Sequence, residues 1–413
     1  LNGDGFSDVI AGAYGNSGNT GKVYIYFGAA LMDNTADVTK TGEDVNNYFG
    51  NSVSSAGDVN GDGYTDLSVG AYGYNANTGR TYLLDYFMKN DITSDLKMTG
   101  EGIDNYFGRS VSSAGDVNGD GYSDVIVGAF YNISKGRTYI YYGGLFADNI
   151  ADVVMTGESN YNYFGNSVSS AGDVNGDGYS DVIIGAYGNN SFTGKAYIYY
   201  GGAPMNNVAD VIMTGEAVDN NFGYSVSSAG DVNGDGYSDV IIGAYARFSL
   251  SGAAYIYFGG ASMNNVYDVI MAPGSADDFF GYSVSEAGDM NGDGFDDVII
   301  GSTGYLTGTG RAYVYFGGSP MNNYADLIMD GEASNNSFGT SVSTAGDVNG
   351  DGFSDVVVGA PGISSAKGKA YIYFGGTSLN NDPDVVMTGE GFQNYFGTSV
   401  STAGDVNGDG YSD

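Results

Sequence analysis

A nine-residue string, Asp-Val-Asn-Gly-Asp-Gly-Tyr-Ser-Asp or a close variant, recurs along the whole chain at intervals of 57 or 58 residues. A fixed period of this kind is typical of proteins in which each repeat is one supersecondary unit stacked on its neighbours. Seven intervals fill the 413 residues without a linker, so we expect residues 1–413 to form a single domain. Full copies begin at Asp58, Asp116, Asp173, Asp231, Asp289, Asp347 and Asp405, and a copy without its first Asp occupies residues 1–8.

Each interval contains four short runs of strand-forming residues, as residues 173–231 illustrate. The runs at 181–187, 196–200 and 210–213 are rich in β-branched and aromatic side chains, and turn-forming residues follow each of them. This composition predicts strands, and the absence of clean alternation between polar and apolar residues indicates that both faces are covered. The fourth run, 225–230, contains only small side chains and Val, so we place it innermost, where the repeats converge.

Four-stranded units covered on both faces predict an all-β fold, a seven-bladed β-propeller with four-stranded antiparallel blades. A parallel β-helix is the competing fold, but its coils are shorter and it leaves two open ends. The N-terminal part supplies the outer strands of one blade, whereas the C-terminal part ends on a single inner strand, 399–404. We therefore expect pairing of the N- and C-terminal strands to close the ring, with a composite blade from residues 1–45 and 396–413.

The repeated string carries the spacing of a calcium-binding loop. In one copy, Asp58, Asn60 and Asp62 place oxygen donors at positions one, three and five, and Asp66 adds a carboxylate at position nine. Gly at position six permits a positive φ, after which the carbonyl of Tyr64 at position seven can point inward. The spacing matches the first nine positions of a loop of the EF-hand type. Calcium suits it because this hard cation takes about six to eight oxygens in flexible geometry, whereas magnesium demands a tighter octahedron.

An Asx-rich turn without an ion is the alternative interpretation, because Asp, Asn and Gly are the residues that turns prefer. Repetition favours the metal, since seven full copies keep the same donors at the same offsets, which a turn does not require. We predict Ca²⁺ as the cofactor, at about seven sites. The predicted ligands are Asn2, Asp4, Phe6, Asp8, Asp58, Asn60, Asp62, Tyr64, Asp66, Asp116, Asn118, Asp120, Tyr122, Asp124, Asp173, Asn175, Asp177, Tyr179, Asp181, Asp231, Asn233, Asp235, Tyr237, Asp239, Asp289, Asn291, Asp293, Phe295, Asp297, Asp347, Asn349, Asp351, Phe353, Asp355, Asp405, Asn407, Asp409, Tyr411 and Asp413.

The two ends of the chain carry one loop copy more than a ring of seven blades needs. Either residues 405–413 complete the site of the composite blade and residues 1–8 are displaced, or the reverse holds. In a third arrangement, Asp405 joins three side chains of the N-terminal copy in a hybrid site. Because the chain begins within a motif, without an initiator Met or a signal peptide, we expect a processed product or a segment of a longer protein.

Missing residue types exclude most catalytic chemistry. The chain has 13 Lys and Arg against 49 Asp and Glu, a formal net charge of −36, and no His, Cys or Trp. Without His or Cys there is no Ser/His/Asp or Cys/His catalytic group, no usual zinc or haem site and no disulfide. The acidity argues against nucleic-acid partners. The sequence also lacks a run of 18 apolar residues, so we expect no membrane insertion. No acidic pair stands out from the repeat as a glycosidase pair would, so we expect no enzyme.

Two short elements within each repeat resemble the FG-GAP repeats of the integrin α-subunit β-propeller and its microbial relatives. The Gly-Ala-Pro element is literal at 359–361 and varied elsewhere, at Gly12, Gly70, Gly128, Gly185, Gly243 and Gly301. The Phe-Gly element begins at Phe49, Phe107, Phe164, Phe222, Phe280, Phe338 and Phe396. The resemblance implies a seven-bladed propeller with calcium in the loops between the first and second strands. Near-identical repeats, the lack of Cys and the lack of leg domains argue for a microbial surface relative rather than an integrin.

These observations favour a non-enzymatic, calcium-binding extracellular module for adhesion or for a cell-surface assembly. Extracellular calcium modules bind at about 10⁻⁴–10⁻³ M, so we expect an extracellular or cell-surface location. A lectin-like propeller is an alternative, because Asn and aromatic residues at 46–48 and 160–163 lie on the face opposite the calcium loops. That face would take a protein or glycan ligand, or the same loops are simply solvated. Self-assembly is a further alternative, as a filament linked by exchange of strand 399–404.

Overall fold

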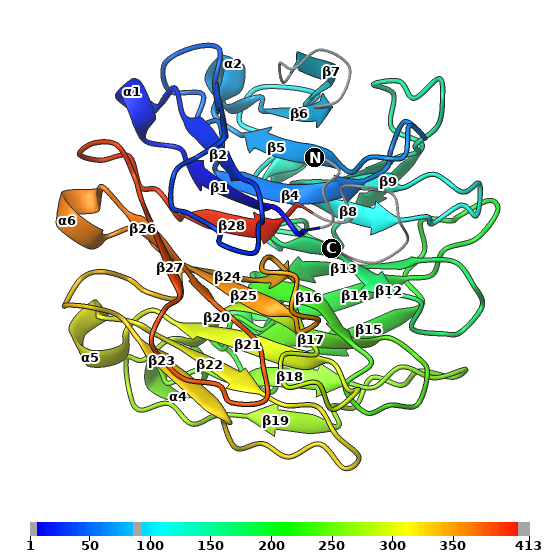
Figure 1. The fold of residues 1–413 in the computed structure, drawn as a ribbon. Coiled ribbons are helices and arrows are strands. Elements are labelled where there is room, and N and C mark those ends of the chain that lie inside the picture. Colours follow the sequence, from blue (N-terminus) through cyan, green and yellow to red (C-terminus); the bar gives the residue numbers. More distant parts are fainter. Residues whose placement is uncertain (1–5, 86–92, 404–413) are drawn as a thin grey trace.

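The computed structural model describes residues 6–85 and 93–403 of the chain. Within these residues, seven four-stranded antiparallel sheets are arranged as a ring (Figure 1). The innermost strand of each sheet contacts the innermost strands of its two neighbours, so the cycle closes. The predicted all-β, seven-bladed propeller is therefore confirmed.

The strands of each blade follow one another from the axis outward. The blades are β28 (Ser399–Thr402), β1 (Val9–Ala13), β2 (Lys22–Tyr26) and β3 (Val38–Thr41); β4 (Ser52–Gly57), β5 (Asp66–Ala71), β6 (Arg80–Asp85) and β7 (Thr93–Thr99); β8 (Ser110–Gly115), β9 (Asp124–Ala129), β10 (Arg137–Tyr141) and β11 (Val153–Thr156); β12 (Val168–Gly172), β13 (Asp181–Ala186), β14 (Lys195–Tyr199) and β15 (Val211–Thr214); β16 (Ser225–Gly230), β17 (Asp239–Gly243), β18 (Ala254–Tyr257) and β19 (Val269–Met271); β20 (Phe280–Gly288), β21 (Asp297–Ser302), β22 (Arg311–Tyr315) and β23 (Leu327–Asp330); β24 (Ser341–Gly346), β25 (Asp355–Ala360), β26 (Lys369–Tyr373) and β27 (Val385–Thr388).

The two ends of the chain meet in one blade. β28 pairs antiparallel with β1, with Val9 opposite Thr402 and Gly12 opposite Ser399. The closure predicted from the position of the chain ends is therefore confirmed. β28 thus completes a sheet of its own chain through the edge that faces β1.

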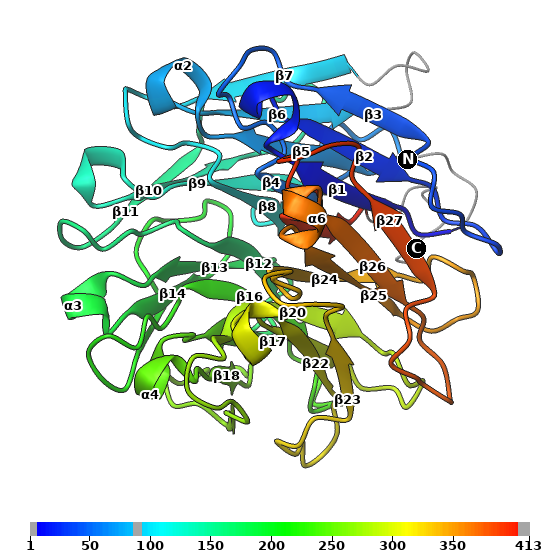
Figure 2. The same cartoon turned by 90° about the vertical axis from the view of Figure 1, so that its left-hand side faces the viewer.

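The connections of each blade alternate between the two faces of the disc. The link between the second and third strands is a single helical turn, and these turns gather on the face shown toward the viewer in Figure 2. In one of them, Asn190 and Ser191 have φ values of 48° and 54°, so the turn is not regular helix. The turns are α1 (Asn16–Asn19), α2 (Tyr74–Asn77), η1 (Asn132–Ser134), α3 (Asn189–Phe192), α4 (Arg247–Leu250), α5 (Tyr305–Gly308) and α6 (Ile363–Ala366). Nowhere in residues 6–85 and 93–403 is there a helix long and apolar enough to cross a membrane.

The hydrophobic core lies between the blades. Each second strand is buried along its whole length, as β9 and β13 show. Ile126 and Ile140 of one blade pack in a cluster with Ile184 and Tyr197 of the next. Both faces of the strands are therefore apolar, which is why the sequence shows no clean alternation.

Glycines bring neighbouring backbones into direct contact. A Cβ on Gly128 in β9 would lie 2.0 Å from the carbonyl oxygen of Gly165, which precedes the inner strand of the next blade. The Gly165 amide donates to the Gly185 carbonyl of its own blade at 3.0 Å. Beside this contact, the ring of Phe164 is buried and meets Tyr197 edge-to-face at 5.4 Å. The Phe-Gly and Gly-Ala elements are thus the two sides of one junction between blades.

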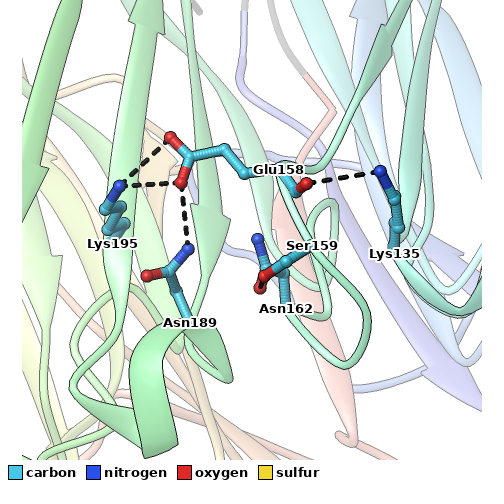
Figure 3. A network of polar contacts seen from close by, with 6 residues as sticks. All are labelled: Lys135, Glu158, Ser159, Asn162, Asn189 and Lys195. Atoms are coloured by element: carbon cyan, nitrogen blue, oxygen red, sulfur yellow. Dashed lines mark hydrogen bonds and ion pairs between the residues drawn. The ribbon is translucent and has the colours of Figure 1, made fainter.

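Ion pairs join the blades near the rim of the same face as the helical turns. In Figure 3, the Lys195 Nζ of one blade lies 2.8 Å from Glu158 Oε2 of the preceding blade, and Asn189 donates to the same oxygen. Lys135 donates to the Glu158 carbonyl from the other side. Burial raises the pKa of Glu158, but the contacts with Lys195 and the hydrogen bonds from Asn189 and Tyr197 together leave the pKa below its ordinary value. Equivalent pairs are Lys22–Glu390, Arg80–Glu43, Arg137–Glu101, Arg247–Glu216 and Lys369–Glu332.

Replacement of the junction glycine tests the backbone contact. We expect Gly128→Ala to lower the free energy of unfolding by about 2–4 kcal/mol, since the new methyl group collides with a backbone oxygen that cannot move alone. Denaturant unfolding at saturating calcium measures the change. The control is Gly102→Ala, where the nearest atom to the new Cβ is 3.7 Å away. Equal stability of the two variants would contradict the proposed role of the contact.

Candidate metal centre

The loop between the first and second strands of each blade wraps around the carboxylate at its first position. In the loop between β8 and β9, Asp116 Oδ1 accepts from the amides of Gly119 and Asp120 at 2.7 and 3.1 Å. Asp116 Oδ2 accepts from the Gly121 amide at 2.8 Å. Asn118 Oδ1 accepts from the Asp120 amide at 2.8 Å. The same bonds recur in the loops that begin at Asp58, Asp173, Asp231, Asp289 and Asp347.

The two glycines of the loop are needed for different reasons. Gly121, at position six, has a φ of +89° and open space around it, so its backbone conformation is what favours glycine there. Gly119, at position four, also faces a neighbour, because a Cβ there would lie 2.5 Å from the ring of Tyr179. Tyr179 is position seven of the next loop, so each aromatic ring covers the loop of the preceding blade.

Successive loops are also joined by backbone hydrogen bonds. The Ser180 amide of one loop donates to the Asp116 carbonyl of the preceding loop at 3.0 Å. The Gly202 amide, which follows the third strand of the same later blade, donates to the Val117 carbonyl at 2.8 Å. Within the described residues, the candidate metal loops are therefore connected from blade to blade as a belt along one face of the ring.

The carboxylate at position nine is buried within the blade. Asp124 has no exposed surface, and its two oxygens accept from the amides of Val117 and Gly143 at 2.9 and 2.8 Å. Burial raises the pKa of Asp124, the two amide hydrogen bonds lower it, and the nearby charges of Asp120 and Asp116 raise it further. The resulting pKa is about 7. Three carboxylates of one loop therefore repel one another, and a cation between them would remove that cost. Burial raises the pKa in the same way at Asp181, Asp239, Asp297 and Asp355.

The donor set of the loops fits calcium. Among the described residues, no three acidic side chains form a group that could hold a metal ion by themselves. By the spacing of the loop, Asn118 and the Tyr122 carbonyl would add an amide and a carbonyl oxygen to the carboxylates of Asp116, Asp120 and Asp124. Each carboxylate oxygen has a second lone pair, so its bond to a backbone amide does not prevent coordination. An all-oxygen set with several carboxylates is what Ca²⁺ prefers.

Hydrogen bonds link the residues at positions one, three and five of a loop, as the Asp120 amide shows with Asp116 and Asn118. The role of the predicted ligands in binding calcium stays a prediction. At the N-terminus, Phe6 covers Gly350, and the Ser7 amide donates to the Asp347 carbonyl at 3.0 Å. Asp8 Oδ1 accepts from the Gly28 amide at 3.0 Å. Residues 6–8 thus occupy positions seven to nine of the nine-residue loop in the composite blade and are not displaced from it. Asn2, Asp4, Asp405, Asn407, Asp409, Tyr411 and Asp413 lie outside the described residues.

Sequence reasoning missed one acidic pair, Glu286 and Asp296. Both replace Ser or Thr of the other repeats, and that departure was the signal that could have revealed them. They line a cavity of about 410 Å³ together with Ser170, Ser228 and Asp231. Burial raises the pKa of Glu286 to about 7, and the Asp296 charge adds to the effect.

Comparison with known proteins gives one family and several relatives. The FG-GAP repeat matches residues 1–26, 49–84, 107–141, 164–199, 222–257, 280–315 and 338–373, which is more than half of the chain. Integrin alpha-5 of Xenopus laevis is 31% identical over 213 residues, which cover 48% of this chain and 20% of the relative. Human integrin alpha-IIb is 33% identical over 218 residues, with coverages of 48% and 20%. Integrin alpha-4 of Xenopus laevis is 31% identical over 255 residues, with coverages of 57% and 23%. The chain thus spans about a fifth of the length of these relatives.

The raised pKa of Glu286 gives a pH-dependent stability. An unfolded Glu titrates near 4.5, so between that pH and about 7 the folded state binds the proton more tightly. Stability therefore falls as the pH rises through this range, and the cost is complete above about 7. We expect Glu286→Ser to raise the free energy of unfolding by about 1–2 kcal/mol near pH 8, and the gain to vanish below about pH 4.5.

Thermal unfolding of both proteins across this pH range, at saturating calcium, measures the difference. Thr344→Ser, at the equivalent position of the next blade, is the control and should show no such pH-dependent difference. A gain from Glu286→Ser that is the same at every pH would contradict the assignment.

Proposed function

Because this chain belongs to the FG-GAP repeat family, we propose that it is a non-enzymatic, calcium-binding extracellular propeller that serves in adhesion or in a cell-surface assembly. The observation that carries the proposal is the belt of loops with one repeated all-oxygen donor set. The integrin alpha-like propeller family is generally non-enzymatic. Adhesion is proposed from the relatives, which are integrin alpha subunits.

An extracellular location follows from the kind of loop. Calcium loops of extracellular modules bind at about 10⁻⁴–10⁻³ M, and cytosolic calcium would leave them empty. The formal net charge of −36 is consistent with this, since 21 Asp occupy ligand positions in the seven full loop copies. Calcium would neutralise much of this charge outside the cell.

Calcium would stiffen the ring because each loop is fastened to the next. The Asp116 loop accepts hydrogen bonds from Ser180 and Gly202 of the following blade. An ion that fixes one loop therefore also fixes the junction with its neighbour. A ligand present at a hundred times its Kd adds about 2.7 kcal/mol per site, so several sites together would dominate stability.

A titration that counts the bound ions tests the proposal. We expect native mass spectrometry or calorimetry to give about seven calcium ions per chain. Asp177→Asn removes the position-five carboxylate of one loop, so the count should fall by one. Asp219→Asn, an exposed position outside every metal loop, removes the same charge and should keep the full count. Equal counts for the two variants, or no binding at millimolar calcium, would refute the proposal.

Removal of the metal tests the stiffening separately. We expect excess EGTA to lower the melting temperature sharply, because the loops lose the bound ion and their carboxylates then repel the buried carboxylate at position nine. Circular dichroism through the melt, with and without added calcium, provides the measurement. An unchanged melting temperature in EGTA would show that the ions do not support the fold.

A lectin-like function with equivalent sugar sites between blades is the second candidate. It requires free aromatic rings in the inter-blade loops. Instead, Tyr48 stacks on Tyr72 at 4.9 Å and Tyr163 stacks on Tyr187 at 5.0 Å. These rings seal the junctions between blades, which favours the adhesion or structural module over a set of equivalent sugar sites.

A further inference from the structure

One charged residue breaks the symmetry of the channel mouth. The residue after each Phe-Gly pair stands where an inner strand begins, on the face opposite the metal loops. Arg109 holds this position in one blade, and the other six blades place uncharged residues there. The six are Asn51, Asn166, Tyr224, Tyr282, Thr340 and Thr398, and all seven residues line the cavity at the inner strands.

Arg109 faces a cavity lined by aromatic rings, which we call the axial pocket. Its volume is about 530 Å³, within the range of about 300–1,000 Å³ that is usual for small-ligand sites. Tyr14, Tyr72, Tyr106 and Tyr395 line it together with Arg109. The guanidinium carbon lies 5.8 Å from the centre of the Tyr72 ring.

The charge of Arg109 acts on tyrosines from several blades. Burial raises the pKa of Tyr14 to about 12, and the Arg109 charge opposes this rise. The same opposition is present at Tyr72, Tyr187 and Tyr224, where burial also raises the pKa. These effects agree with the place of Arg109 at the inner strands, where it lines one cavity with residues of the other blades.

No carboxylate partner accompanies this guanidinium in the described part of the chain. The other arginines all have one: Arg80 with Glu43, Arg137 with Glu101, Arg247 with Glu216 and Arg311 with Asp330. The backbone carbonyl of Arg109 accepts a hydrogen bond from the Asn51 side chain. Arg109 is also one of the residues that line the pocket. A partly buried cation without a counter-ion is costly, so the pocket favours an anionic group.

We propose that the axial pocket binds one acidic sugar, with its carboxylate on Arg109 and its hydroxyl groups on the polar side chains that line the same cavity. Guanidinium groups hold carboxylates through two parallel hydrogen bonds. Asn51, Thr340 and Thr398 line the same cavity and supply polar partners for the hydroxyl groups of a sugar. The three polar side chains favour a uronic acid, which carries several hydroxyl groups, over the side chain of an acidic peptide, which carries none. The site occurs once per ring and does not rest on calcium binding.

Calorimetric titration with glucuronic acid, at saturating calcium, tests the site. We expect glucuronic acid to bind with one site per chain, and glucose, which lacks the carboxylate, to bind at least tenfold more weakly. Arg109→Asn installs the residue that stands at this position in two other blades, and should weaken the binding of glucuronic acid at least tenfold. Lys367→Asn, which removes a positive charge beside α6, is the control and should bind as the parent does. Arg109→Lys should be intermediate, because it keeps the charge but loses the paired hydrogen bonds.

Three results would overturn the proposal. The first is that glucose binds as tightly as glucuronic acid. The second is that the Arg109→Asn variant binds glucuronic acid as tightly as the unmodified protein does. The third is equally tight binding of N-acetyl-aspartate amide, which would assign the pocket to acidic peptides instead of sugars. Melting temperatures of the variants at saturating calcium show whether each one is folded, so a loss of binding is not confused with a loss of structure.

Discussion

The structure depends on the close approach of two backbones at every junction between blades. A Cβ at Gly12, Gly128 or Gly359 would meet a carbonyl oxygen of the next blade at about 2 Å, so only glycine fits. This spacing lets the apolar faces of neighbouring blades interdigitate and buries the Phe of each Phe-Gly pair. At the same spacing of the blades, the candidate metal loops lie within hydrogen-bonding distance of one another. Loosening of one junction would therefore affect the core and the belt of loops together.

The sequence predicted the architecture well because the repeat averages out local ambiguity. Short runs such as 181–187 are ambiguous alone, yet their recurrence leaves few folds that bury every copy. The hydrogen bonds that fold each loop around its first Asp join residues within nine positions, so no long-range geometry was needed to expect a tight loop there. Closure by β28 and β1 was predictable because the ends of the chain supply complementary parts of one blade.

Features that depend on contacts between repeats were not predictable in this way. The ring of Tyr179 over Gly119 links residues of different blades, and nothing in one repeat indicates it. Glu286 and Arg109 look like ordinary substitutions in the sequence. Their significance arises because the inner strands face a common channel, where one charged side chain meets residues from several blades. Departures from the consensus of the repeat are the signal by which such residues can be found.

In the composite blade, a candidate metal loop contributes to closure of the ring. In the other blades, the peptide chain itself connects the inner strand to the second strand. Here β28 and β1 come from opposite ends of the chain, and hydrogen bonds such as that from the Ala403 amide to the Asp8 carbonyl hold them together. The N-terminal segment is also held by the preceding metal loop, through Ser7 on the Asp347 carbonyl and Phe6 over Gly350. An ion that orders the Asp347 loop would thereby stabilise the seam of the ring as well as its own blade.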